Sequence, residues 1–153
     1  MSKFVDSKQA GDKGEALVYG LLYAKHGEKL QHVSQYWKAD VYRDDKNRRL
    51  PDFKLPEKFV EVKTKKGYLD MINIDVSQVN EYLAIAKDWG VGIHVYFVDT
   101  KEGAVYRLNE KSLRNPSKTV RGSRGNFFMY DKKDQKLILK NLPKHFISND
   151  LVT

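Results

Sequence analysis

Residues 50–66 read LPDFKLPEKFVEVKTKK and contain two short β-type segments around a turn. Valine, phenylalanine and threonine are enriched in strands, and proline suits the second position of a type I turn. We therefore predict a hairpin in which Leu50–Leu55 pairs with Lys58–Thr64 and Pro56-Glu57 forms the turn. This hairpin is the part of the sequence that decides the fold.

The short turn also fixes which residues of the hairpin face each other. Counting outward from the turn, Phe53 faces Val60. The next pair is Asp52 with Glu61, and like charges directly opposite each other, with Cβ atoms about 4.5 to 5.5 Å apart, are destabilising. Because side chains alternate along a strand, Lys63 lies on the same face as Glu61. A divalent cation with oxygen ligands would relieve the repulsion between the two acids.

The lysine adds a chemical function to this face. Its ammonium group can orient or deprotonate a water, or neutralise charge on an attacked phosphate, which is the chemistry of phosphodiester hydrolysis. A Glu-x-Lys triplet alone is common on ordinary solvated strands. The Pro-Asp pair nine residues before Glu61 and the apolar residues around it favour the catalytic interpretation. Asp40 is the alternative to Asp52 for the metal-binding aspartate, but no register argument supports it.

The remaining patterns indicate an α/β domain with a mixed sheet. Two stretches have helical spacing of apolar residues, and glycine follows each of them. Ser77 is a plausible N-cap of the second helix. One apolar run suits a strand in the middle of the sheet. The predicted elements are a helix at Lys8–His26, one or two short strands within Leu30–Arg43, a helix at Ser77–Trp89, a central strand at Val91–Val98 and a strand at Ala104–Leu108.

Composition narrows the class of protein further. A length of 153 residues predicts one domain, and the absence of cysteine excludes disulfides, thiolate zinc sites and iron-sulfur clusters. The net charge is +8, and residues 100–153 hold 12 basic and 5 acidic side chains, so we expect a polyanionic partner. The longest apolar runs are too short to span a bilayer. Residues 1–15 have no apolar signal segment, and we expect a cytoplasmic location.

The motif Pro51-Asp52 followed by Glu61-Val62-Lys63 resembles that of the PD-(D/E)xK nuclease superfamily. The resemblance covers roughly residues 11–108. It implies a restriction-endonuclease-like αβββαβ core with a mixed central sheet flanked by helices. It also implies a Mg²⁺ or Mn²⁺ ion held by Asp52, Glu61 and the main-chain carbonyl of Val62.

Two further positions match motifs found in parts of this superfamily. Many members add a glutamate from the first helix, and Glu15 in GDKGEALVYGLL borders the apolar face of the predicted helix. Its alternative role is that of an ordinary acid in a first helical turn. Gln78 and Tyr82 resemble the Gln-x-x-x-Tyr motif of RecB-like and lambda-exonuclease-like nucleases, although Tyr82 can equally be a core residue. Archaeal-type Holliday junction resolvases show a similar short arrangement.

Basic residues outside the motif are candidates for phosphate contacts. The stretch 111–130 contains no acid, and we predict a flexible loop at Gly122-Ser123 and Gly125 that leads into a strand. Such residues bind nucleic acid without sequence preference, whereas a plain solvated loop is the alternative. The candidates are Lys65, Lys66, Lys118, Arg121 and Arg124.

We therefore expect a single nuclease domain over residues 1–153, with a core at about 8–108 and a basic extension at 109–153. The hypothesis is a magnesium-dependent deoxyribonuclease of recombination or repair, structure-specific and homodimeric like a junction resolvase, with DNA as its partner and a phage source as one option. The alternatives are a restriction endonuclease and a nucleic-acid-binding module without catalysis. The proposed catalytic residues are Glu15, Asp52, Glu61, Lys63 and Gln78.

Overall fold

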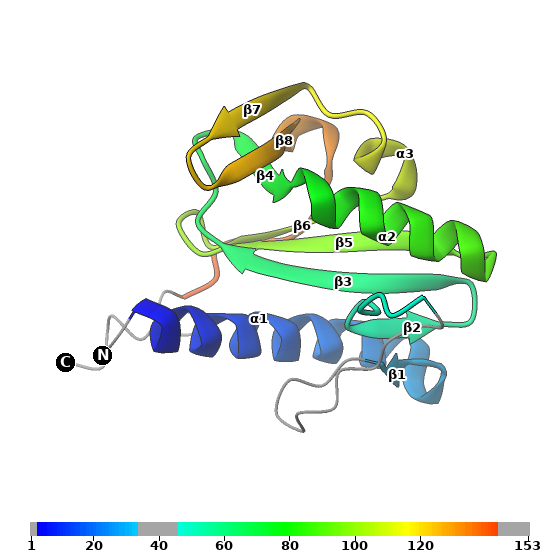
Figure 1. Ribbon diagram of the computed structural model, residues 1–153. Helices are drawn as coiled ribbons and strands as arrows, with labels where there is room; N and C mark the ends of the chain where they lie inside the picture. The colour runs from blue at the N-terminus through cyan, green and yellow to red at the C-terminus, as the bar shows by residue number, and fades with distance from the viewer. Residues whose placement is uncertain (1–2, 34–45, 144–153) are drawn as a thin grey trace.

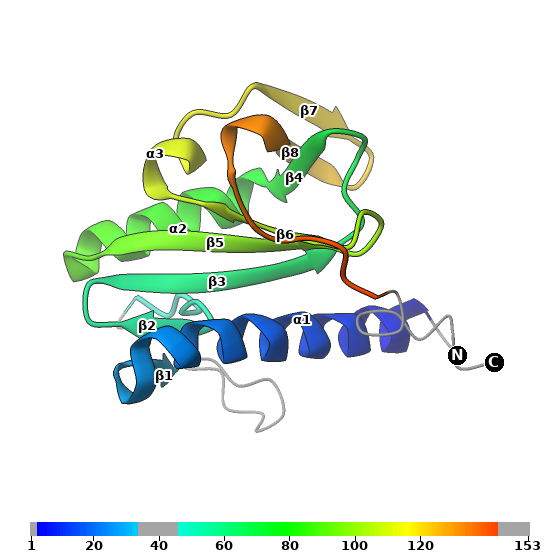
Figure 2. The same cartoon turned by 180° about the vertical axis from the view of Figure 1, so that it is seen from behind.

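The computed structural model describes residues 3–33 and 46–143. A six-stranded sheet has the order β1-β2-β3-β5-β6-β9, and a second sheet has the order β4-β8-β7. Helix α1 covers one face of the larger sheet, whereas α2 and the smaller sheet lie over the other (Figure 1). The view from behind shows α1 running along β3 (Figure 2). The helices and strands are α1 (Lys3–His26), β1 (Gln31–His32), β2 (Phe53–Leu55), β3 (Lys58–Lys65), β4 (Met71–Asp75), α2 (Val76–Trp89), β5 (Gly92–Asp99), β6 (Ala104–Leu108), α3 (Glu110–Leu113), β7 (Lys118–Gly122), β8 (Gly125–Asp131) and β9 (Lys136–Leu139), with 3₁₀ turns at Gly27–Lys29 and Lys132–Asp134.

The predicted hairpin and its register are confirmed, but its first strand is shorter than the predicted Leu50–Leu55, because β2 covers only Phe53–Leu55. Strands β2 and β3 are antiparallel, and Phe53 pairs with Val60. Strand β3 pairs in parallel with β5, whereas the other pairs of the large sheet are antiparallel, so the sheet is mixed as predicted. The apolar run near residue 95 forms β5, with strands on both sides of it.

Side chains of β3 alternate between the two faces of the sheet and join two separate apolar clusters. Phe59 packs on the α2 side with Ile85. Val60 packs on the α1 side with Val18. Because Glu61 follows Phe59 by two residues, its side chain points to the α2 face.

The first turn of α2 differs from the prediction. The side chain of Asp75, not that of Ser77, caps the helix, because its carboxylate accepts hydrogen bonds from the backbone N–H groups of Ser77 and Gln78. Asp75 also ends β4, a strand that the sequence patterns did not reveal. Gly90 ends the helix with a φ of 68°, as expected for glycine after a helix.

The predicted flexible loop near residue 123 is wrong. Strands β7 and β8 form a hairpin that pairs Gly122 with Gly125, which leaves a two-residue turn. A φ of 123° at Gly125 explains why glycine is present there. The predicted strands within residues 30–43 are described only for Gln31–His32, and Asp40 lies outside the described residues. Within the described part of the chain, no helix is long and apolar enough to span a membrane.

Candidate active site

The site lies where the pairing of β2 with β3 stops. Beyond the pair of Phe53 and Val60, the carboxylate of Asp52 takes the place of a strand partner, and its Oδ2 accepts a hydrogen bond of 2.8 Å from Val62 N–H. The backbone N–H of Asp52 donates to Glu61 Oε1 at 3.2 Å. Both carboxylates are buried, with Asp52 4% and Glu61 8% exposed. The two acids that the register places opposite each other do meet.

Two side chains stabilise negative charge on Glu61. The Nζ atom of Lys63 lies 3.3 Å from Glu61 Oε2, and the hydroxyl of Tyr82 in α2 donates to the same oxygen. Burial alone would raise the pKa of Glu61, but the Lys63 ammonium and the hydrogen bonds from Asp52 and Tyr82 lower it below its ordinary value. Burial and the charge of Glu61 raise the pKa of Asp52. The two carboxyls therefore titrate as a coupled pair, in which Asp52 binds a proton more readily than Glu61 does.

Glu15 approaches the same pair from α1. A Cβ atom at Gly14 would collide with the hydroxyl oxygen of Thr64, so the helix lies directly against β3. Glu15 is buried, and its Oε1 atom has no hydrogen-bond partner. Burial and the charge of Glu61 raise the pKa of Glu15 to about 7. The structure thus brings a third acid to the open edge of β3.

A cavity of about 250 Å³ opens beside this third acid. The cavity lies where α1 meets β1 and β2, and Glu15 is part of its wall, whereas neither Asp52 nor Glu61 lines it. The cavity is lined by Asp12, Glu15, Ala16, Tyr19, His32 and Phe53.

The carboxylates of Glu15, Asp52 and Glu61 are the kind of ligand that a hard divalent cation binds, but their side chains do not surround a metal position. Within residues 3–33 and 46–143, no three His, Asp or Glu side chains stand in an arrangement that could hold a metal ion. Two observations nevertheless match such a ligand set. Glu15 Oε1 is buried without a partner, and three carboxyl groups, those of Glu15, Asp52 and Glu61, are buried in this part of the molecule. Mg²⁺ and Mn²⁺ prefer oxygen ligands of this kind.

Gln78 and Tyr82 lie one turn apart on α2, but the structure brings only Tyr82 to the acids. The hydroxyl of Tyr82 bonds Glu61, whereas Gln78 is exposed in the first turn, where its backbone N–H donates to Asp75. The sequence spacing placed both residues on one face and left the role of Tyr82 open. Arg49, predicted only as part of a polar turn, lies near enough for its positive charge to lower the pKa of Glu15.

The candidate phosphate contacts fall into two groups. Lys65 follows Lys63 on the same face of β3, is partly buried, and has its Nζ atom 5.0 Å from the ring centre of Phe127. Burial and the charge of Lys63 lower the pKa of Lys65 to about 8. Lys66 is exposed. The second group is exposed on the β7–β8 hairpin and consists of Lys118, Arg121 and Arg124.

Comparison with solved structures gives a match to Hjc, a Holliday junction resolvase from the archaeal hyperthermophile Archaeoglobus fulgidus. The TM-score is 0.54 and the identity 17%, and the match covers 84% of this chain and 91% of Hjc. The chain has a restriction-endonuclease-like fold. Its succession of α1, β1, β2, β3, α2 and β5 is the predicted αβββαβ core, with the mixed central sheet between helices. No protein-family model and no curated protein matches the sequence.

Proposed function

We propose that the protein is a divalent-metal-dependent DNA nuclease that cuts branched DNA. The observation that supports this most directly is the meeting of Asp52 and Glu61 at the open edge of β3, with Lys63 in contact with Glu61. The buried Glu15 lies near enough for the charge of Glu61 to raise its pKa. Buried acids with raised pKa values beside a lysine are rare outside functional sites. The similarity to a Holliday junction resolvase suggests the class of DNA, and cutting both strands of a junction calls for a homodimer.

The ion would be held by Glu15, Asp52, Glu61 and the carbonyl oxygen of Val62. The N–H of Val62 points to Asp52, and the C=O of a strand residue points to the same side as its N–H. That carbonyl therefore lies on the edge where the acids meet. When bound, Mg²⁺ or Mn²⁺ supplies positive charge that polarises a phosphate and makes a nearby water more acidic.

The other side chains of the site bind and orient. The Nζ atom of Lys63, now paired with Glu61, can reach an oxygen of the attacked phosphate and stabilise the charge that develops there. The hydroxyl of Tyr82 lowers the pKa of Glu61 and so favours its ionised form, which is the form that binds a metal ion. Gln78 is exposed, and we propose that it positions the DNA. It does not position the acids.

Five lysine and arginine side chains, four of them exposed, would bind the DNA backbone. Lys66 continues the strand that carries Lys63, and the basic β7–β8 hairpin lies over the α2 face of the large sheet (Figure 1). Contacts of this type do not read sequence, and the affinity that they supply falls steeply as salt rises. The residues concerned are Lys65, Lys66, Lys118, Arg121 and Arg124.

The test is cleavage of end-labelled linear, single-stranded, flapped and four-way DNA with Mg²⁺ or Mn²⁺ and with EDTA. We expect metal-dependent products that Asp52→Ala and Lys63→Ala abolish, while DNA binding and folding are retained. The exposed residues Asp134 and Lys111 supply matched controls, and their alanine variants should cut normally. Cleavage at the normal rate by either site variant would refute the assignment. Binding without any metal-dependent product would favour a nucleic-acid-binding module of the same fold.

A further inference from the structure

The connection between β3 and β4, residues 66–70, exposes two large apolar side chains, and we name it the tip. Tyr68 is 65% and Leu69 71% exposed, more than any other large apolar side chain among the described residues. The turn is tight, because Tyr68 and Met71 exchange backbone hydrogen bonds of 3.2 and 2.9 Å. Leu69 has a φ of 55°, a left-handed conformation that is unfavourable for a branched side chain.

A buried ion pair holds this strained turn in place. Asp99 is 1% exposed, and its Oδ1 accepts a hydrogen bond of 3.1 Å from Gly67 N–H. Lys132 places its Nζ atom 2.7 Å from Asp99 Oδ2 and 3.1 Å from the carbonyl oxygen of Leu69. The backbone N–H of Lys132 also donates to the carbonyl of Asp70 at 3.0 Å. These contacts hold the backbone of the tip in a rigid conformation. Backbone strain that the surrounding structure maintains in this way is typical of functional segments.

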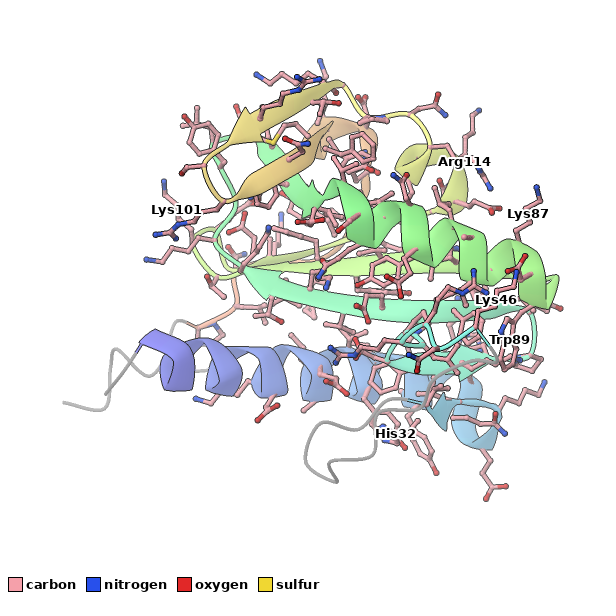
Figure 3. All side chains as sticks on the ribbon, in the orientation of Figure 1. His32, Lys46, Lys87, Trp89, Lys101 and Arg114 are labelled. Carbon is pink, nitrogen blue, oxygen red and sulfur yellow. The ribbon has the colours of Figure 1, made fainter. Side chains whose placement is uncertain are left out.

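The tip follows the strand that carries Lys63, and exposed charges of both signs lie near it. Asp70 in the tip and Glu102 in the β5–β6 turn are acidic, whereas Lys66, Lys101 and Arg124 are basic. Tyr68 follows Lys63 by five residues, so the two Cα atoms are at most about 17 Å apart. Lys101 of the β5–β6 turn lies at the same end of the molecule (Figure 3). Both ribbon views also place the β7–β8 turn, with Arg124, at this end (Figures 1 and 2). The exposed residue Lys66 lies two positions before Tyr68 in the chain.

An exposed apolar tip with lysine and arginine side chains near it fits one kind of polyanion. A continuous duplex offers phosphates and groove edges, because its bases are stacked inside. At a branch point or strand end, unpaired bases expose their flat faces, and aromatic side chains stack on such faces whatever the sequence. The basic surroundings bind the flanking phosphates, and the rigid backbone lowers the entropy lost when the tip is ordered on DNA.

We propose that Tyr68 and Leu69 stack against unpaired bases of the DNA while Lys66 and its basic neighbours bind the flanking phosphates. This inference rests on the proposed function and narrows its substrate to DNA with unpaired bases within a few nucleotides of the cut. The tip would then contribute to substrate selection, and it would have no role in the chemistry at Asp52 and Glu61.

The test measures binding in EDTA, so that no DNA is cut. Two DNAs carry 2-aminopurine, whose fluorescence reports stacking: a branched DNA labelled at the branch point and a linear duplex labelled internally. For Tyr68→Ala we expect a roughly tenfold loss of affinity for the branched DNA, the loss of its fluorescence response, and unchanged binding of the duplex. Tyr23→Ala, which removes another exposed tyrosine, should bind both DNAs as the unchanged protein does.

A second variant separates loss of stacking from loss of folding. Leu69→Gly removes the side chain and relieves the left-handed strain, so its melting temperature should equal or exceed that of the unchanged protein, while its preference for branched DNA falls. Equal affinities of the tip variants and the unchanged protein for branched DNA would overturn the proposal. A change in oligomeric state on gel filtration with an unchanged fluorescence response would also overturn it, and would assign the tip to a protein interface.

The two proposals fail in different ways. Cleavage by the unchanged protein together with normal binding by Tyr68→Ala would leave the nuclease assignment intact and remove the stacking role. Loss of branched-DNA binding in Tyr68→Ala, without metal-dependent cleavage by the unchanged protein, would leave the stacking role intact and remove the nuclease assignment.

Discussion

The carboxyl group of Glu15 makes the metal-free protein sensitive to pH. Burial and the charge of Glu61 raise its pKa from 4.5 to about 7, a difference that corresponds to about 3 kcal/mol. The folded protein therefore binds more protons than the unfolded chain between these two pH values. Its free energy of unfolding falls as the pH rises through this window, and the stabilisation by protonated Glu15 is lost above pH 7.

Replacing Glu15 by glutamine keeps the shape of the side chain and removes the charge. In EDTA at pH 8 we expect Glu15→Gln to be more stable than the unchanged protein by up to about 3 kcal/mol, or roughly 6 to 12 °C in melting temperature. At pH 4.5 the two proteins should melt together, because Glu15 is protonated in the folded state. Added Mn²⁺ should raise the melting temperature of the unchanged protein at pH 8 more than that of the variant.

The assay is thermal unfolding at pH 4.5 and pH 8, with EDTA or Mn²⁺. Glu28→Gln, at an exposed position just after α1, is the matched control and should follow the unchanged protein throughout. If Glu15→Gln and the unchanged protein kept the same difference in melting temperature at both pH values, Glu15 would not carry the buried charge described here.

Two further predictions concern the supports of the site. Tyr82→Phe removes the hydroxyl that bonds Glu61, so the pKa of Glu61 should rise. The free energy of unfolding measured in urea should fall by about 1 to 3 kcal/mol. An unchanged free energy of unfolding would contradict the contact. Gly14→Ala should cost about 1 to 3 kcal/mol and reduce cleavage, because the added carbon meets Thr64 and pushes α1 from β3. Gly20→Ala, with open space around the added carbon, should instead stabilise by about 0.5 to 1 kcal/mol, and equal effects of the two changes would refute the close packing.

The hairpin and its acids could be predicted because they depend on local rules. A two-residue turn determines the pairing of Phe53 with Val60 by counting alone, and Asp52 and Glu61 follow from it. The central strand and the α/β class follow from continuous apolar runs in the same way. The approach of Glu15 to the acids depended on how α1 packs, and only the resemblance to known nucleases indicated it.

The smaller sheet could not be predicted because its pairing is between distant segments. Met71 pairs with Asp131, and β4 itself has only five residues. Without knowledge of β4, the local residue pattern does not favour Asp75 over Ser77 as the cap of α2. Spacing alone could not separate the roles of Gln78 and Tyr82, because the packing of α2 determines which of them contacts β3. In the structure the hydroxyl of Tyr82 bonds Glu61, whereas Gln78 is exposed.

The anomalous scattering of a crystal soaked in Mn²⁺ would locate a bound metal ion directly. We expect one strong peak at the edge of β3, in contact with carboxylate oxygens of Asp52 and Glu61 and facing Glu15. An empty edge with both acids bonded only to protein groups, or a peak elsewhere on the molecule alone, would contradict it.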